Sequence, residues 1–118
     1  MHQCLYVYVI DEKQLGKVAE LFRALGTVSR LHILTVLAAR PSSVGSVVEA
    51  TGLSQPLVSQ HLRVLRGINI VTVNRSGRDA VYSLADDHVA HVIDDAITHT
   101  TERVDAAFDG APEEKEES

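Results

Sequence analysis

Residues 51–66 read TGLSQPLVSQHLRVLR, a sequence typical of two helices joined by a tight turn. Gly52 fits the position just past a helix end, where a left-handed backbone is common. Ser54 can cap the next helix, and Pro56 is tolerated in its first turn. That helix has apolar residues at positions i, i+4 and i+7, namely Val58, Leu62 and Leu65. The stretch therefore predicts a helix-turn-helix whose second helix has one buried face.

The other faces of this second helix are polar. An α-helix fits the major groove of DNA, where amide and hydroxyl side chains can read base edges and arginine can reach an edge or a phosphate. The candidate DNA-contacting residues here are Ser54, Gln55, Ser59, Gln60 and Arg63. A polar helix face is equally typical of a solvated surface, so this helix alone leaves both interpretations open.

A basic hairpin is predicted directly after the helix. The runs IVTVN (70–74) and DAVYSL (79–84) are strand-like, and RSGR joins them, with Gly77 supplying the turn. Arg75 and Arg78 flank the tip and can reach the DNA backbone or minor groove. Helix, turn, helix and hairpin together predict a winged helix-turn-helix that binds double-stranded DNA.

Helical patterns also precede and follow this unit. Residues 11–26, 27–41 and 44–50 have apolar residues at helical spacing, and so does the stretch from Asp86 to about Val104. We therefore expect a mainly α fold with a small β-hairpin. The expected organisation is a leader (1–10), one DNA-binding and dimerisation domain (11–106) and a disordered acidic tail (107–118).

Composition narrows the function. The single cysteine, Cys4, fits a reducing cytoplasm, and no apolar run approaches a membrane span, so we expect a cytoplasmic protein without a membrane partner. Residues 1–85 contain nine Lys or Arg and five acids, whereas residues 86–118 contain two and eleven. The basic part suits a phosphate backbone, and the acidic part can bind a cation.

The stretch 86–102, DDHVAHVIDDAITHTTE, has the spacing of a shared metal site. On a helix, His99 and Glu102 are neighbours, and Asp86 as the N-cap can lie beside His88. The two histidines are about 16 Å apart along the axis, too far to bind one ion. If two chains cross antiparallel near residue 94, each pair meets the opposite pair of the partner. The spacing thus predicts a homodimer with two four-ligand sites.

The alternative is a surface helix that is merely rich in histidine and aspartate. Two imidazoles and two carboxylates suit four-coordinate Zn(II), and Co(II) accepts the same ligands. Ni(II) generally takes more ligands, which His2 and Cys4 of the leader could supply. His91 lies near the same stripe outside the four-residue pattern, so a solvent-exposed or outer role is expected for it.

Three segments resemble the ArsR/SmtB family of bacterial metal-sensing repressors: AELFRALGTVSRLHILTVLA, TGLSQPLVSQHLRVLR and SGRDAVYSL. The resemblance covers roughly residues 15–105. Two positions depart from the family pattern, because Thr27-Val28 replaces the usual Asp-Pro and Asn69 replaces a usual glycine. The resemblance implies a winged helix-turn-helix homodimer with its N- and C-terminal helices at the interface.

The resemblance also assigns the metal ligands. Asp86, His88, His99 and Glu102 match the zinc branch in type and spacing, which implies a repressor that binds a palindromic operator when metal-free and leaves it on binding Zn(II). The alternatives are a regulator of the same fold that senses Ni(II) or Co(II) through extra N-terminal ligands, or a non-metal signal. The sequence lacks HExxH, and a four-ligand seam is closed, so no enzyme is expected.

Overall fold

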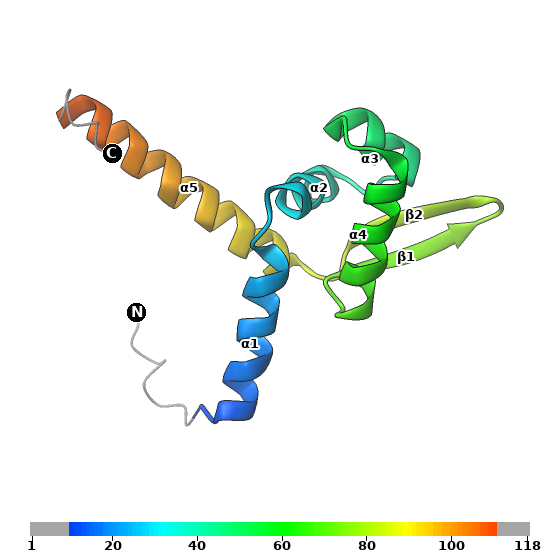
Figure 1. Cartoon of the computed structure of the whole chain (residues 1–118), viewed down its shortest axis with the longest axis horizontal. Coiled ribbons are helices and arrows are strands. Elements are labelled where there is room, and N and C mark those ends of the chain that lie inside the picture. Colours follow the sequence, from blue (N-terminus) through cyan, green and yellow to red (C-terminus); the bar gives the residue numbers. More distant parts are fainter. Residues whose placement is uncertain (1–9, 111–118) are drawn as a thin grey trace.

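The computed structural model describes residues 10–110, with side chains as far as Glu102. It confirms a mainly α fold with one antiparallel hairpin (Figure 1). The elements are α1 (Glu12–Leu25), α2 (Val28–Ala39), α3 (Val44–Thr51), α4 (Gln55–Gly67), β1 (Val71–Ser76), β2 (Asp79–Leu84) and α5 (Asp87–Gly110). Helix α5 continues past its predicted end near Val104. The predictions for His2, Cys4 and residues 111–118 fall outside the described residues.

All five of the described helices begin at a side chain that accepts a hydrogen bond from the first turn, which satisfies an otherwise unpaired backbone N–H. The caps are Asp11, Thr27, Ser43, Ser54 and Asp86. Thr27 accepts from the Arg30 amide at 3.3 Å, so it caps α2 at the position where the family pattern has aspartate. The departure at Thr27 therefore preserves the local structure.

A residue with left-handed backbone conformation follows each helix of the helix-turn-helix. Gly52 has φ 77° and ends α3, as predicted, and its amide donates to the Val48 carbonyl at 2.8 Å. Asn69 has φ 64°, and the amides of Asn69 and Ile70 donate to the carbonyls of Arg66 and Leu65. This pair of bonds is a Schellman motif, and asparagine is one of the few residues that tolerate its left-handed position.

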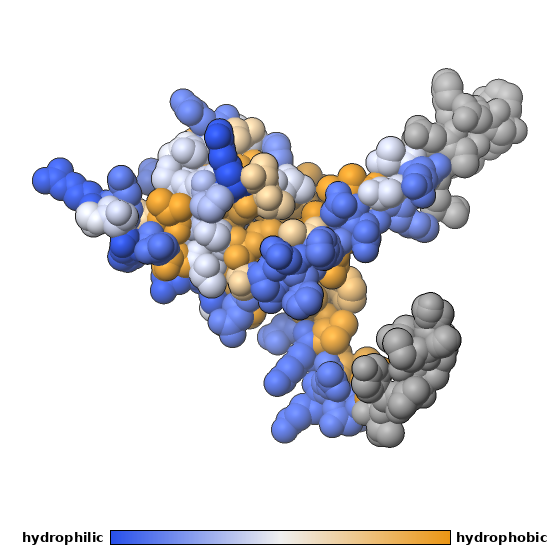
Figure 2. Space-filling view, turned by 180° about the vertical axis from the view of Figure 1, so that it is seen from behind, coloured by the Kyte–Doolittle hydropathy of each residue, from blue (hydrophilic) through white to orange (hydrophobic). Residues whose placement is uncertain are grey.

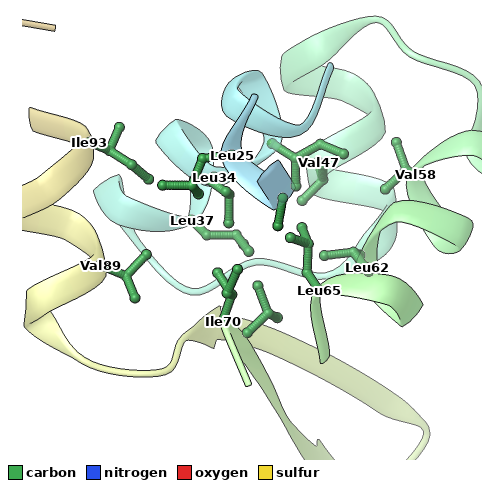
Figure 3. Packing of buried hydrophobic residues seen from close by; sticks show 13 residues of the cluster. Leu25, Leu34, Leu37, Val47, Val58, Leu62, Leu65, Ile70, Val89 and Ile93 are labelled. Carbon is green, nitrogen blue, oxygen red and sulfur yellow. The ribbon is translucent and has the colours of Figure 1, made fainter. Parts of the chain in front are cut away.

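The core lies where α2, α3, α4 and the start of α5 meet (Figure 3). Val58, Leu62 and Leu65 are fully buried there, as their spacing predicts. On α2 the apolar residues are divided between the core and the surface, because Ile33 is buried whereas Val28 and Leu31 are exposed. On α1 the C-terminal residues Ala24 and Leu25 are buried, and the apolar residues Leu15, Val18 and Phe22 remain exposed.

The hairpin and α5 point away from the core in opposite directions (Figure 1). Strands β1 and β2 pair from Val71–Leu84 to Ser76–Asp79, and the backbone of Tyr82 exchanges two hydrogen bonds with Ser42 in the α2–α3 connection. This bridge fixes the base of the hairpin against the helices. Among the described residues no single helix is long and apolar enough to cross a membrane; only α1 and α2 together, bent by 94°, pass by length and composition.

Candidate nucleic-acid interface and metal centre

Helix α4 presents its polar residues on the surface opposite Val58 and Leu62. Gln55, Gln60 and Arg63 are exposed there, and Ser59 is half-buried. The hydroxyl oxygen of Ser54 accepts from the Leu57 amide at 3.3 Å, so Ser54 serves as the helix cap as well as a candidate contact. The candidate residues on α4 therefore form one accessible surface about the width of a helix, which the major groove admits.

A basic groove of about 490 Å³ lies between α4 and the hairpin. Its lining residues are Ser59, Arg63, Arg66, Gly67, Arg75 and Tyr82. Arg63 and Arg75 were predicted DNA contacts from the sequence, whereas Arg66 was not assigned a role. The i, i+3 spacing of Arg63 and Arg66 places both on the hairpin side of α4 and could have indicated it. Three guanidinium groups in one groove suit a phosphate strand.

The tip of the hairpin is also basic and exposed. Gly77 has φ 64° and forms the turn with Arg78, whose side chain is exposed. Arg75 lies on β1 opposite Ala80, set back from the tip. Seen from behind, the projecting hairpin ends in hydrophilic surface (Figure 2). The wing therefore places one arginine at its end and another in the groove beside α4.

His61 lies on the opposite side of α4 from the hairpin. Its Nδ1 accepts a hydrogen bond from Nε of Arg30, in the first turn of α2, at 3.3 Å. The neutral ring consequently carries its proton on Nε2. Burial, followed by the nearby Arg30 guanidinium, lowers the pKa of His61 below 6.5. The contact with Arg30 joins residues 31 positions apart, so no local pattern in the sequence indicates it.

The predicted metal ligands all lie at or on α5. Asp86 directly precedes the helix, and its Oδ1 accepts from the Val89 amide at 3.1 Å. The predicted N-cap role of Asp86 is therefore present, and the second carboxylate oxygen remains for another partner. His88, His99 and Glu102 are exposed. Two imidazole nitrogens and two carboxylates remain a donor set that fits Zn(II).

One chain does not gather these four residues. Within the described part of the chain, no three His, Cys, Asp or Glu side chains lie close enough to hold a metal ion. The pair near Asp86 packs beside the core, where Val89 is buried, while the pair near His99 lies on the projecting half of α5. Every residue from Asp94 to Glu102 is exposed. A second chain must cover this half of α5 if the four residues are to meet.

The surface around α1 and α5 is apolar enough to receive a second chain. Leu15, Val18 and Phe22 are 51%, 41% and 55% exposed on α1. Phe22 also lines a cavity of about 240 Å³, together with Leu25, Gly26, Leu31, Val92, Ile93 and Ala96. In Figure 2 this apolar surface runs from the body of the domain onto the projecting α1. Exposed apolar patches of this kind mark interaction sites.

The sequence of this chain is similar to those of known proteins. A family model described as bacterial regulatory protein, arsR family, matches residues 27–73. The HTH-type transcriptional regulator NmtR of Mycobacterium tuberculosis is 46% identical over 91 residues, which are 77% of this chain and 76% of NmtR. The HTH-type transcriptional repressor SmtB of Mycobacterium tuberculosis is 43% identical over 88 residues, which are 75% of this chain and 65% of SmtB.

A solved structure gives the same fold. The homodimeric winged helix-turn-helix DNA-binding domain Mb0332 from Mycobacterium bovis matches with a TM-score of 0.73 at 28% identity, over 78% of this chain and 85% of that chain. The helices and hairpin thus define a winged helix-turn-helix transcription regulator. Within that class, the chain belongs to the arsR family of bacterial regulatory proteins.

Proposed function

We propose that the protein is a homodimeric transcriptional repressor that binds operator DNA when metal-free and is released by Zn(II). The observation that supports this proposal is that Asp86 and His88 lie at the start of α5, whereas His99 and Glu102 lie on its projecting half, which is the spacing that two shared half-sites would need. Membership in the arsR family and similarity to a protein named as a transcriptional repressor support the DNA-binding part of the proposal.

The DNA-binding half of the proposal rests on α4 and the wing. Two α4 helices in a symmetric dimer would enter successive major grooves about 34 Å apart, which requires a palindromic operator. Gln55, Ser59 and Gln60 would read base edges, with Ser54 at the helix start. Arg63 and Arg75 line the basic groove and Arg78 ends the wing, so they would contact the sugar–phosphate backbone.

The metal half rests on an antiparallel pairing of two α5 helices. In that pairing Asp86 and His88 of one chain face His99 and Glu102 of the other, and two-fold symmetry creates the site twice. The apolar surface of α1 and the cavity at Phe22 would be covered in the same dimer. When bound, Zn(II) supplies a four-coordinate link between the chains.

The segment that connects the wing to α5 is short. Ala85 and Asp86 alone separate β2 from α5, and the Ala85 amide donates to the Ile70 carbonyl at 2.9 Å, next to β1. A constraint on the start of α5 therefore reaches the base of the wing directly. Restricting the two α5 helices would fix the spacing of the wings and weaken operator binding, and operator DNA must weaken zinc binding by the same factor.

Fluorescence anisotropy of labelled operator DNA tests the proposal. DNA recovered by selection from a random library with the metal-free protein provides the operator, and wild type and His99→Ala are titrated with and without Zn(II). We expect zinc to weaken DNA binding by the wild type by roughly 5- to 150-fold, as for typical allosteric couplings. His99→Ala should bind DNA normally and ignore zinc. Unchanged wild-type affinity in zinc would refute the sensing role.

The identity of the metal needs a separate experiment. Titration with Zn(II), Co(II) and Ni(II) is repeated on full-length His2→Ala and Cys4→Ser. If the four α5 residues suffice, Co(II) gives the absorption spectrum of a four-coordinate site in all three proteins. A larger Ni(II) response that is lost in His2→Ala or Cys4→Ser would instead favour a nickel or cobalt sensor that uses the leader.

A further inference from the structure

The exposed surface of α4 is flanked by arginine on both sides, but only one side belongs to the basic groove. Arg63 and Arg66 lie on the hairpin side. His61 lies about 160° around the helix from Arg63 and about 140° from Arg66. Arg30, in the first turn of α2, donates a hydrogen bond to His61 on this other side. Gln60 and Val64, both exposed, lie between the two flanks.

This arrangement matters because a helix in the major groove has a phosphate strand on each side. The groove is about 12 Å wide and a helix with side chains is about 10–12 Å across, so both flanks of α4 meet a strand. The wing and the basic groove supply cations to one strand. The opposite strand would meet the side of α4 on which His61 and Arg30 lie.

The local chemistry suits Arg30 for that strand. Its Nε–H donates to Nδ1 of His61, which leaves both Nη groups to donate to a phosphate. The first turn of α2 contains no acid that would offset the charge, and the helix N-terminus there favours an anion. Arginine has a flexible side chain, so a hydrogen bond at Nε reduces the entropy lost when it binds DNA.

We propose that Arg30 contacts the phosphate strand on the side of α4 away from the wing, and that His61 is the positioning residue that orients it. The inference rests on the proposed seating of α4 in the major groove. Each protomer would then grip both strands, one through Arg63, Arg66 and Arg75 and the other through Arg30. His61 acts through Arg30 and needs no DNA contact of its own.

The salt dependence of binding tests the Arg30 contact. Binding of the metal-free protein to a mixed-sequence duplex is measured by anisotropy at salt concentrations between about 50 and 200 mM. The duplex has about 30 base pairs, which is long enough for both protomers of a dimer to bind. Each phosphate contact contributes about 0.9 to the slope of log K against log salt, so Arg30→Ala should reduce it by about 1.8 per dimer. Arg30→Lys, which keeps the charge, should retain the slope.

The matched control is Lys13→Ala, which removes the same charge from the first turn of α1, at the end remote from α4 (Figure 1). Its slope should equal that of the wild type. An unchanged slope in Arg30→Ala, or an equal decrease in Lys13→Ala, overturns the contact. If either of these results is found while zinc still releases the wild type from its operator, the Arg30 contact is refuted and the proposed function is not. If the wild type binds no duplex, the inference and the proposed function fall together.

A double-mutant cycle tests the role of His61. His61→Ala should weaken binding by about two- to tenfold for each protomer, the range for one hydrogen bond, without changing the salt slope. His61→Asn should restore affinity, because its amide oxygen can accept from Nε in place of Nδ1. In an Arg30→Ala background, His61→Ala should have no further effect. A full loss in that background would show that His61 acts independently and would overturn the positioning role.

Discussion

At the α4 end of the molecule, three arginines from one helix and one strand line a single groove, whereas at the α5 end the predicted ligands are distributed along one projecting helix. The first surface is complete in one chain, because α4 and the hairpin are both fixed to the same core. The proposed metal site would require another chain. DNA recognition can therefore be preformed in the protomer, while the proposed sensing would depend on assembly.

The largest expected effect comes from mixing two inactive variants. Asp86→Ala/His88→Ala removes one half-site, and His99→Ala/Glu102→Ala removes the other, so each homodimer should bind no zinc at α5. A heterodimer of the two contains one intact site and one empty of ligands. After subunit exchange, half of the dimers should be mixed, giving about one zinc per four chains against one per chain in the wild type.

Zinc binding is measured by equilibrium dialysis, and the matched control is His91→Ala, whose residue lies beside the pattern. His91→Ala should bind zinc as the wild type does. If the mixture of inactive variants binds no zinc, the sites do not span two chains. If either variant alone retains full binding, the four residues are not the ligands.

The second comparison concerns stability, measured by urea unfolding at one protein concentration. Leu65→Ala removes a fully buried side chain from α4 and should reduce the free energy of unfolding by about 2–5 kcal/mol. Ile97→Ala changes a similar side chain on the projecting half of α5, where it is 47% exposed in one chain. In the proposed dimer a partner covers this half, so the loss should exceed about 1 kcal/mol, the usual limit for a side chain that stays exposed. A smaller loss would show that no partner packs against this part of α5.

These differences also explain what the sequence could predict. Gly52, Ser54 and the spacing of Val58, Leu62 and Leu65 are local signals, so the helix-turn-helix follows from about sixteen residues. The period of α2 could not show that Ile33 faces the core while Leu31 faces outward, since both are apolar. A helical pattern shows which residues share a side of the helix but not whether its own chain or a partner covers that side.

Contacts between distant segments were harder still. Arg30 and His61 are 31 positions apart, and nothing local in either segment predicts their hydrogen bond. Arg66 and Arg75 line one groove because β1 begins close after α4 and packs against it, and the Ser42–Tyr82 bridge also holds the hairpin beside the helices. The candidate ligands on α5 need no such contact between distant segments, since their spacing along one helix leads directly to the prediction of a shared site, which remains a prediction.

A third prediction separates affinity from specificity within the α4 surface. Arg66→Ala should weaken binding to all duplexes alike and reduce the salt slope by about 1 per chain, because a phosphate contact carries no sequence information. Gln60→Ala should leave the slope unchanged and lose about 1–3 kcal/mol of discrimination between operator and mixed-sequence DNA. Competition anisotropy measures both. If Gln60→Ala reduced the salt slope and Arg66→Ala reduced the discrimination, Gln60 would contact the phosphate and Arg66 would read the base.

A smaller effect is expected at Asn69, which ends α4 with φ 64°. Asn69→Ala should lower the free energy of unfolding by about 1 kcal/mol, since a residue with Cβ and no compensating polar group is disfavoured in the left-handed region. Asn69→Gly should be neutral or slightly stabilising. Thermal denaturation of the two variants beside the wild type measures the difference, and equal melting temperatures for Ala and Gly would exclude this strain.

The smallest effect concerns pH and again separates the two ends of the molecule. Burial and then Arg30 lower the pKa of His61, so the folded protein favours the neutral ring and the unfolded chain binds more protons below pH 6.5. The stabilisation from this site is complete above pH 6.5 and is lost as the pH falls through the lowered pKa.

The variant His61→Asn tests this effect because its side chain cannot titrate. The difference in unfolding free energy between wild type and His61→Asn, measured without metal from about pH 8 to 5, should therefore decrease toward acid. A constant difference would show that His61 has the same pKa in both states, and His91→Asn on exposed α5 provides the reference for a histidine without such a contact.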